Sequence, residues 1–520
     1  MKKRLLSFLL IPMLLTGCSS NLKLQFVPLK SYVEAKDLMR NYEDEYLYSK
    51  KETTPVTYSN DKTINDLRDL LLVNRSGYER KNILPTGERK LLVVPVYFTD
   101  SDTSTHEKKT IFIQNAFFGD TSHTNYDSVA GYYNKSSYGQ LKLTGEVAPW
   151  YNTGKSSKEW ANYTHTVASN NIACQAIDYL KTHSDIDFSQ YDLDDDNNID
   201  GVYIIYDHPQ EDNTSNSLFW AYTYYTHPND DGYNTTEPYL NNYSWTSVET
   251  IIQKDNRSYT NYLIHETGHL FGLTDYYNTL SSSKTSYHYQ PTGCFDMMDY
   301  NIGDHSALSK YLLKWSSPLV TKKGNYTVKL KPLNSSGEYL LVPSSKYNNS
   351  PFSEYLLIEY FAPTGLNNYS GTFSYVDKNG NSGIYRYPQH YGLKIYHVNA
   401  TLGYFVKGNN TNLICTIDDP DWESKTNGKT VGLDYAYTNS LSDSDAEKGS
   451  PTFYHLLESS GSNSFIDGVP ANNGTLFKVG DDFGITKFVD YKFSNGEAVN
   501  FTLKVEKINS KEITLNIVKG

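Results

Sequence analysis

The stretch HETGHLFGLTD, residues 265–275, decides the fold of this 520-residue chain. It contains His265 and His269, and residues four apart lie above one another on one face of a helix. The two imidazoles can then bind one Zn²⁺, while Glu266 lies beside the metal as a base. The pattern therefore predicts a zinc-binding helix over about residues 258–271.

The residues around the motif argue against the alternative interpretation, a surface helix with two solvated histidines. Leu263 and Ile264 precede the motif, and Leu270 and Phe271 follow it. These apolar neighbours predict a buried helix. Because buried imidazoles and a buried carboxylate need partners, the setting favours a metal site.

Asp275 is the predicted third ligand. Gly272 can adopt a left-handed conformation that ends the helix, so that the chain turns back and brings Asp275 to the metal. The other common zinc-helix architecture takes its third ligand from a glutamate on a following helix. Here the first glutamate after Glu266 is Glu338, far downstream in a strand-like region. The pattern fits a short ligand loop and indicates a zinc peptidase.

A second element, GCFDMMDY at residues 293–300, follows the zinc motif. A methionine turn beneath the zinc is typical of the metzincin arrangement. Met298 fits this role better than Met297, because it has the hydrophobic-Met-polar context of such a turn. The alternative is a pair of ordinary core methionines, but the position after the zinc motif favours the turn.

The chain resembles the immune inhibitor A family of secreted bacterial metallopeptidases. The resemblance is carried by HETGHLFGLTDYY (265–277), GCFDMMD (293–299) and SALSKYLLKW (306–315), and it extends over roughly residues 88–520. The family usually has a proline and an aspartate where this chain has Thr274 and Asn278, neither of which is a ligand.

The resemblance implies the site residues. The zinc ligands are then His265, His269 and Asp275, and Glu266 is the general base that takes a proton from a zinc-bound water and delivers it to the leaving amine. Tyr277 matches the family's DxY pattern and is the catalytic candidate for stabilising the oxyanion. Tyr300 and His305 are the other candidates for that role.

Two functions compete at this stage. The first is a surface-anchored zinc metalloendopeptidase that hydrolyses peptide bonds of extracellular proteins. The second is a lipid-anchored glycan- or protein-binding surface protein with an inactive peptidase fold. The intact HExxHxxGxxD set favours the enzyme, because an unused site has no physical reason to keep all four groups.

The N-terminus, MKKRLLSFLLIPMLLTGCSS, is typical of a bacterial lipoprotein signal. A basic segment precedes the apolar run 5–15, which is too short to span a bilayer. Residues 15–18, LTGC, resemble a lipobox, so residues 1–17 would be removed and Cys18 lipidated. The alternative is an ordinary signal peptide cut near the same place. We therefore expect attachment to the extracellular face of a bacterial membrane through Cys18.

Charge and cysteine content restrict the partners. Removal of Lys2, Lys3 and Arg4 takes the formal net charge from −12 to −15, which argues against nucleic-acid binding. We expect protein or peptide substrates and a monomer. Apart from Cys18 the chain has three widely spaced cysteines, which do not make a disulfide framework and leave any pairing open: Cys174, Cys294 and Cys415.

The organisation predicts an α+β protein of several parts. Residues 18–87 are polar and are expected to form a tether or pro-segment. Residues 88–320 are expected to form a metzincin-like zinc peptidase domain, a twisted sheet with an active-site helix. Residues 321–520 alternate apolar and polar side chains in short segments, which predicts an all-β, sandwich-like domain. Further expected elements are strands at 91–98 and 202–206 and helices at 127–135, 166–182 and 306–315.

The acidic run DLDDDNNID, residues 192–200, is a candidate calcium site. It places oxygen ligands at alternate positions, as the first part of an EF-hand loop does. It departs from that loop at Asn197 and Tyr203, which replace the glycine and the final glutamate. The alternative is an acidic turn, although carboxylates packed without a cation repel one another. The candidate structural Ca²⁺ ligands are Asp192, Asp194, Asp196, Asn198 and Asp200.

Overall fold

The computed structural model describes most of the chain from residue 82 onward. The predicted signal peptide, Cys18, nearly all of the predicted tether and Asp194 lie outside the described residues. The described ranges are 32–34, 82–193, 195–211, 217–226, 236–252, 257–280, 289–369, 371–376, 380–406, 413–429 and 431–520.

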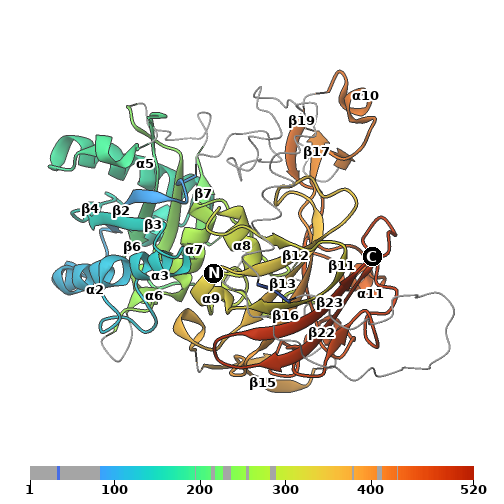
Figure 1. The fold of residues 1–520 in the computed structure, drawn as a ribbon. Coiled ribbons are helices and arrows are strands. Elements are labelled where there is room, and N and C mark those ends of the chain that lie inside the picture. Colours follow the sequence, from blue (N-terminus) through green and yellow to red (C-terminus); the bar gives the residue numbers. More distant parts are fainter. Residues whose placement is uncertain are drawn as a thin grey trace, which may run out of the picture.

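The first half of the described chain forms an α/β domain around one sheet (Figure 1). The strand order is β3-β2-β6-β9-β7, and β4 also pairs with β2. All neighbours run parallel except β7, which is antiparallel to β9 and is the last strand at that edge. The strands are β2 (Gly87–Tyr97), β3 (Leu141–Val147), β4 (Tyr151–Asn152), β6 (Val202–Tyr206), β7 (Tyr222–Tyr225) and β9 (Asn242–Ser247).

Helices bury both faces of this sheet. Along β2, Leu91 and Val93 belong to one apolar core, while Leu92 and Val94 belong to another. The first core includes residues of α2 (His106–Phe118), α3 (Val129–Ser136) and α7 (Asn261–Leu270). The second includes residues of α5 (His165–His183). Burial on both faces explains why the central strands are continuous apolar runs.

The second half forms a β domain of two larger, mainly antiparallel sheets, in which β1 and β10 are the strands paired in parallel. One has the order β1-β11-β23-β22-β21, with β1 (Tyr32–Glu34) added in parallel to β11. The other has the order β10-β12-β13-β16-β20. Their strands are β11 (Gly324–Leu330), β21 (Asp482–Phe483), β22 (Phe501–Ile508) and β23 (Ile513–Lys519) in the first, and β10 (Leu319–Val320), β12 (Tyr339–Pro343), β13 (Glu354–Phe361), β16 (Gly392–Asn399) and β20 (Tyr454–Leu457) in the second.

Smaller elements complete the described fold. Two short helices lie in the α/β domain, α4 (Ser157–Trp160) and α6 (Val248–Ile251), and β5 (Asn198–Ile199) pairs there with β8 (Tyr239–Leu240). In the second half, the additional strands are β14 (Thr372–Val376), β15 (Ser382–Arg386), β17 (Leu402–Val406), β18 (Leu413–Thr416) and β19 (Val431–Tyr435), and the helices are α8 (Ala307–Leu312), α9 (Leu333–Ser336), α10 (Trp422–Thr426) and α11 (Asp443–Glu447).

The second β sheet is buried on both of its faces. Leu340 and Leu356 pack in the core that also holds Leu515 of the first β sheet. Their neighbours Leu341 and Leu357 pack instead in the core that holds the apolar residues of α7 and α8. The expected sandwich is therefore present, and its inner sheet also forms one wall of the α/β domain's core.

The predicted elements match the observed ones in kind but differ at their ends. The run 202–206 is β6, and the predicted helices at 127–135 and 166–182 are α3 and α5. The predicted helix at 306–315 ends earlier, because Lys314 has a φ of +61° and Trp315 N–H donates back to Lys310. Helix α2 was not predicted from its sequence.

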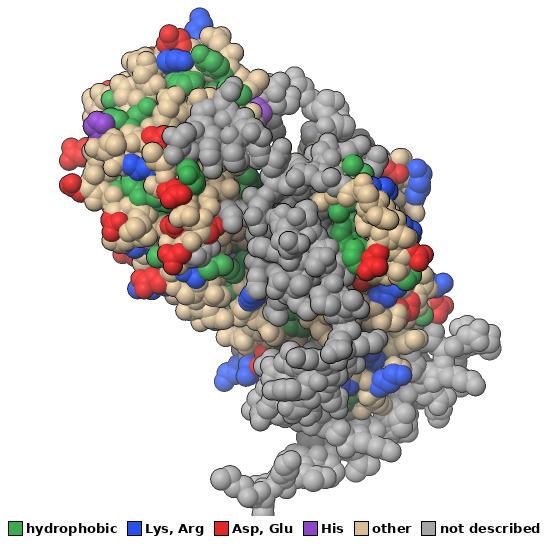
Figure 2. All heavy atoms as spheres, turned by 90° about the horizontal axis from the view of Figure 1, so that it is seen from above, with side chains coloured by type: hydrophobic (Ala, Val, Ile, Leu, Met, Phe, Trp, Pro, Cys, Tyr) green, Lys and Arg blue, Asp and Glu red, His purple; other side chains and the backbone are tan. Residues whose placement is uncertain are grey.

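The surface has mixed charge. On the face seen in Figure 2, acidic and basic side chains of the described residues are interspersed. Among these residues, no helix combines the length and the apolar character that a bilayer crossing requires. The three described cysteines, Cys174, Cys294 and Cys415, form no disulfide with one another.

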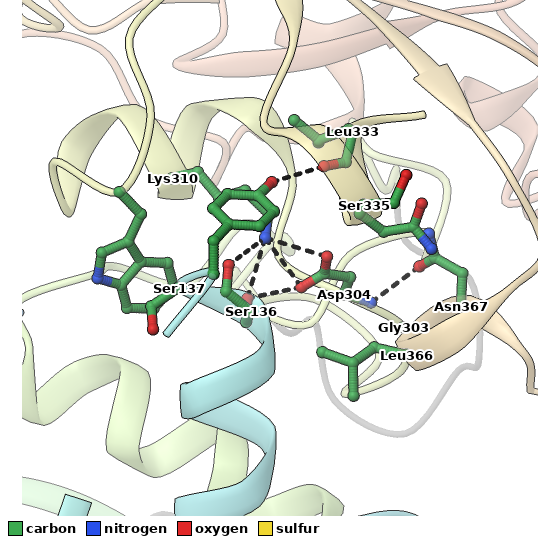
Figure 3. Close-up of polar contacts among 12 residues, drawn as sticks. Ser136, Ser137, Gly303, Asp304, Lys310, Leu333, Ser335, Leu366 and Asn367 are labelled. Atoms are coloured by element: carbon green, nitrogen blue, oxygen red, sulfur yellow. Dashed lines mark hydrogen bonds and ion pairs between the residues drawn. The ribbon is translucent and has the colours of Figure 1, made fainter. Parts of the chain in front are cut away.

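A buried ion pair within the segment of α8 is hydrogen-bonded to the end of α3. Lys310 is fully buried, and its Nζ lies 3.0 Å from Asp304 Oδ2. The same ammonium donates to the Ser136 carbonyl at the end of α3, and Ser136 Oγ donates to Asp304 (Figure 3). The Lys310 Nζ also lies 4.4 Å from the ring centre of Tyr138. The ammonium is thus surrounded by acceptors on several elements.

Breaking this pair should destabilise the protein strongly. We expect Lys310→Met to lower the free energy of unfolding by roughly 3–5 kcal/mol, because it leaves the Asp304 carboxylate buried without its cation. Urea denaturation measures the change. Lys142→Met removes an exposed pair with Glu88, whose side chain is 61% exposed, and should change little. Equal effects of the two variants would contradict this account.

Candidate metal centre

Helix α7 begins at Asn261, three residues later than predicted. Before the helix starts, the backbone N–H of Ser258 donates to the His123 carbonyl and that of Tyr259 donates to the Ile251 carbonyl. The N–H of Thr260 donates to Asn125 Oδ1 at 3.0 Å. This asparagine supplies the acceptor that the first turn of a helix needs.

The helix ends as the sequence predicts. Gly272 has a φ of +92°, which side chains disfavour and glycine tolerates. The N–H groups of Gly272 and Leu273 donate to the carbonyls of His269 and Gly268. The chain then reverses and carries Asp275 back to the histidines, as the ligand-loop interpretation requires.

The two imidazoles point at one carboxylate oxygen. His265 Nε2 lies 3.1 Å and His269 Nε2 lies 3.2 Å from Asp275 Oδ1. Each ring uses its other nitrogen on a backbone carbonyl: Nδ1 of His265 lies 2.9 Å from the Met297 oxygen, and Nδ1 of His269 lies 2.8 Å from the Leu273 oxygen. A proton on each Nδ1 leaves a lone pair on each Nε2, as metal-binding histidines require.

The electrostatics of this group fit a bound cation. Burial opposes charge on His269, yet the Asp275 and Glu266 carboxylates and the Leu273 carbonyl raise its pKa to about 9. Burial likewise raises the pKa of Asp275, but the two histidines lower it well below its usual range. The surroundings therefore favour positive charge between these groups, and two nitrogens with one carboxylate oxygen form a donor set that suits Zn²⁺.

Glu266 lies next to the metal ligands. Donor atoms of His265, Glu266 and His269 lie within 4.8 Å of one another. Glu266 is buried at 7% exposure, and Thr223 Oγ1 donates to its Oε2 at 2.9 Å. Thr223 belongs to the edge strand β7, so the sheet holds this carboxylate in a fixed direction.

Met298 lies against α7, where the methionine turn was expected. A Cβ added at Gly268 would lie 2.5 Å from Met298 Sδ, so only glycine leaves room for the thioether. The turn also supplies the Met297 carbonyl to His265 and the Met298 carbonyl to Tyr276 N–H. It therefore supports both the helix and the ligand loop.

One comparison with known proteins matches the part of the chain that precedes the metal ligands. Residues 61–209 match the family model described as immune inhibitor A peptidase M6, catalytic domain. The protein carries an M6 peptidase catalytic domain. The matched residues include β2, β6, α2 and α3, which share an apolar core with α7, and α5, which packs on the other face of the sheet. A search of the curated proteins finds no match to the chain.

The structure places the three oxyanion candidates differently. Tyr277 is beside the ligands: its ring centre lies 6.2 Å from that of His265, and its hydroxyl hydrogen-bonds Asp275. Burial and the Asp275 and Glu266 charges raise its pKa. Tyr300 is 41% exposed. His305 is fully buried with its Nε2 3.4 Å from Tyr133 Oη, so it cannot meet a substrate.

The acidic loop of the M6 domain is folded around its own backbone. The Asp192 carboxylate accepts the N–H groups of Asp196 and Asn197, both at 3.0 Å. Asp196 Oδ1 accepts from Asn198 N–H, and Asp200 Oδ2 accepts from Leu193 N–H. Asp194 lies outside the described residues. The carboxylates of Asp192, Asp196 and Asp200 are thus hydrogen-bonded to backbone N–H groups of the same loop.

Sequence reasoning missed Thr223. It contacts Glu266 from 43 residues upstream, and nothing in the segment Tyr222–Tyr225 marks it as part of a metal site. Only its place on an edge strand beside α7 reveals the role, and strand order is not visible in a local pattern.

Proposed function

We propose that this protein is a surface-anchored zinc metalloendopeptidase that cleaves extracellular proteins. His265, His269 and Asp275 would hold the zinc, and Glu266 would be the general base. The observation that carries the proposal is the convergence of both Nε2 atoms on Asp275 Oδ1, with the Glu266 carboxylate beside them. Three protein ligands leave a fourth position open, as a catalytic zinc requires.

Each residue of the site has a separate role in peptide-bond hydrolysis. Bound zinc supplies a Lewis acid that polarises the scissile carbonyl and makes water more acidic. Glu266 accepts a proton from the attacking water and delivers it to the leaving amine. Thr223 holds one oxygen of that carboxylate, and the backbone carbonyls on each Nδ1 keep the imidazoles in the required tautomer.

The edge strand β7 supports a polypeptide as the substrate. It is antiparallel, ends the sheet, and carries Thr223, which touches the general base. Its Tyr225 hydroxyl also donates to the His269 carbonyl. An extended peptide that pairs with such an edge strand lies parallel to the strand axis, so its peptide bonds are held in a fixed direction. This arrangement suits cleavage within a polypeptide chain.

Glu266→Gln should separate metal binding from catalysis. We expect the variant to retain about one zinc per chain and to lose about 10²–10⁴-fold in kcat on casein, because the amide cannot accept the proton. Metal analysis and a fluorescent casein assay measure both. Glu249→Gln changes an exposed glutamate on α6 and should leave activity unchanged.

The competing function is a binding protein with an inactive peptidase fold. Bound zinc with no cleavage by the wild-type protein or by either variant would favour it. Cleavage by wild type and by Glu266→Gln at equal rates would also overturn the proposed base.

We propose lipid attachment at Cys18, on the extracellular face of a bacterial membrane. Its support is the basic start, the short apolar run and the LTGC sequence. In a bacterial host, Cys18→Ser should move the protein from the membrane fraction to the soluble fraction and abolish labelling with radioactive palmitate. Ser19→Ala, one residue away, should stay membrane-bound and labelled. Membrane attachment that survives Cys18→Ser would refute the anchor.

We also propose that the acidic loop binds a structural Ca²⁺. Its support is the run of residues 192–200, in which carboxylates and an amide alternate in sequence, and a cation would offset the repulsion among the carboxylates. At constant zinc, calcium at 100 times its Kd should stabilise the protein by about 2.7 kcal/mol, and magnesium should do less. Asp192→Asn should reduce the rise in melting temperature, whereas Asp185→Asn, an exposed control, should keep it. No calcium-dependent change in the wild type would remove the site.

A further inference from the structure

The ligand loop at residues 275–280 has no regular secondary structure of its own. Its Asp275 must nevertheless hold one oxygen about 3 Å from two imidazole nitrogens. A side chain on a loop keeps such a position only where neighbouring groups fix the backbone. Met298 and Gln290 bond the backbone N–H groups of Tyr276 and Asn278, and the other contacts to this backbone from outside the loop come from the β domain.

Tyr276, the residue after Asp275, is held on three sides. Its N–H donates to the Met298 carbonyl at 2.8 Å. Its hydroxyl is hydrogen-bonded to Ser309 Oγ of α8 at 2.9 Å. Its carbonyl accepts from Asn439 Nδ2 at 2.7 Å. The first two contacts lie close in sequence, whereas Asn439 is 163 residues away.

Asn439 links the loop to a strand of the β domain. It is buried, at 3% exposure, and its Oδ1 accepts the N–H of Tyr454 in β20 at 2.9 Å. Both halves of the amide are thus used, one on β20 and one on the carbonyl beside the ligand. A side chain with only an acceptor, or with none, cannot make both bonds.

The residues next to Asn439 hold the rest of the ligand loop. Ser440 Oγ accepts the N–H of Thr279 at 2.9 Å. The Leu441 carbonyl accepts from Asn278 Nδ2 at 2.8 Å. Three consecutive residues of the β domain therefore bond three residues of the segment that carries Asp275.

The methionine turn is anchored from the same side. The N–H of Leu456 in β20 donates to the Pro291 carbonyl at 2.9 Å. The N–H of Ala471 donates to the Gly293 carbonyl at 2.8 Å. This turn carries the carbonyl that orients His265. Both loops that support the metal ligands are consequently bonded to the β domain.

We propose that Asn439 is a positioning residue for the metal centre, through which the β domain sets the place of Asp275. The proposal rests on the function proposed above, in which Asp275 is a zinc ligand. Without the amide, the Tyr276 carbonyl loses its donor, and the ligand loop is free to move its oxygen away from the imidazoles. Loss of a group that orients a zinc ligand typically weakens metal binding by about 10- to 100-fold.

Asn439→Ala should raise the zinc Kd by about 10-fold or more and speed hydrogen exchange at residues 275–280 in the metal-free protein. Asn439→Asp should behave similarly despite its size, because a carboxylate accepts from Tyr454 but offers no hydrogen to the Tyr276 carbonyl. Competition with a zinc-binding dye and exchange mass spectrometry on the full chain give both readouts.

Asn516→Ala is the matched control. Asn516 lies in β23, accepts from Thr327 and donates to Glu506, so the same truncation removes bonds far from the ligand loop. It should lower thermal stability without changing the zinc Kd. Ser440→Ala removes the hydrogen bonds of Ser440 Oγ to the N–H and the hydroxyl of Thr279 at a less buried position, and it should raise the Kd about threefold. It keeps the proposal testable if Asn439→Ala does not fold.

The outcomes separate the two proposals. If the wild-type protein binds no zinc, the proposed function fails. If it binds zinc and cleaves casein, while zinc Kd and exchange at residues 275–280 stay unchanged in the Asn439 and Ser440 variants, only the role of Asn439 is overturned. The same holds if Asn516→Ala weakens zinc binding as much as Asn439→Ala.

Discussion

Three electron-pair donors, two on a helix and one on a loop, must converge on one point. The surrounding contacts hold the donors in this arrangement. Without a cation between them, the lone pairs of His265, His269 and Asp275 repel one another. Backbone carbonyls orient the two rings, Gly272 reverses the chain, and Met298 fills the space beneath Gly268. Each contact restricts a degree of freedom that would otherwise let the donors separate.

The chemistry of the centre was predictable from sequence because it depends on short spacings. Histidines four residues apart, a glycine after the helix and an aspartate three residues later specify a helix, a reversal and a ligand. The apolar run of β6 was predictable for a similar reason, since a strand buried on both faces needs apolar residues throughout. Helix α2 was not, because HEKKTIFIQNAFF mixes charged and apolar residues without a clear stripe.

What the sequence could not predict depends on long-range pairing. Thr223 meets Glu266 only because β7 is the edge strand beside α7. The bond from Asn439 to Tyr276 requires two distant loops to meet, and an asparagine between short strands has many possible roles. Lys314 ends α8 in a left-handed conformation that its residue type does not announce.

The doubly buried inner sheet has a further consequence. Because Leu340 and Leu341 point into different cores, β12 cannot leave one half of the molecule without exposing the other. We therefore expect the peptidase half and the β half to unfold as one cooperative unit, unlike domains joined by a linker. Release of the outer β sheet would expose one face of the inner sheet, whose other face is a wall of the catalytic half, so we expect local unfolding near the C-terminus to affect the metal site.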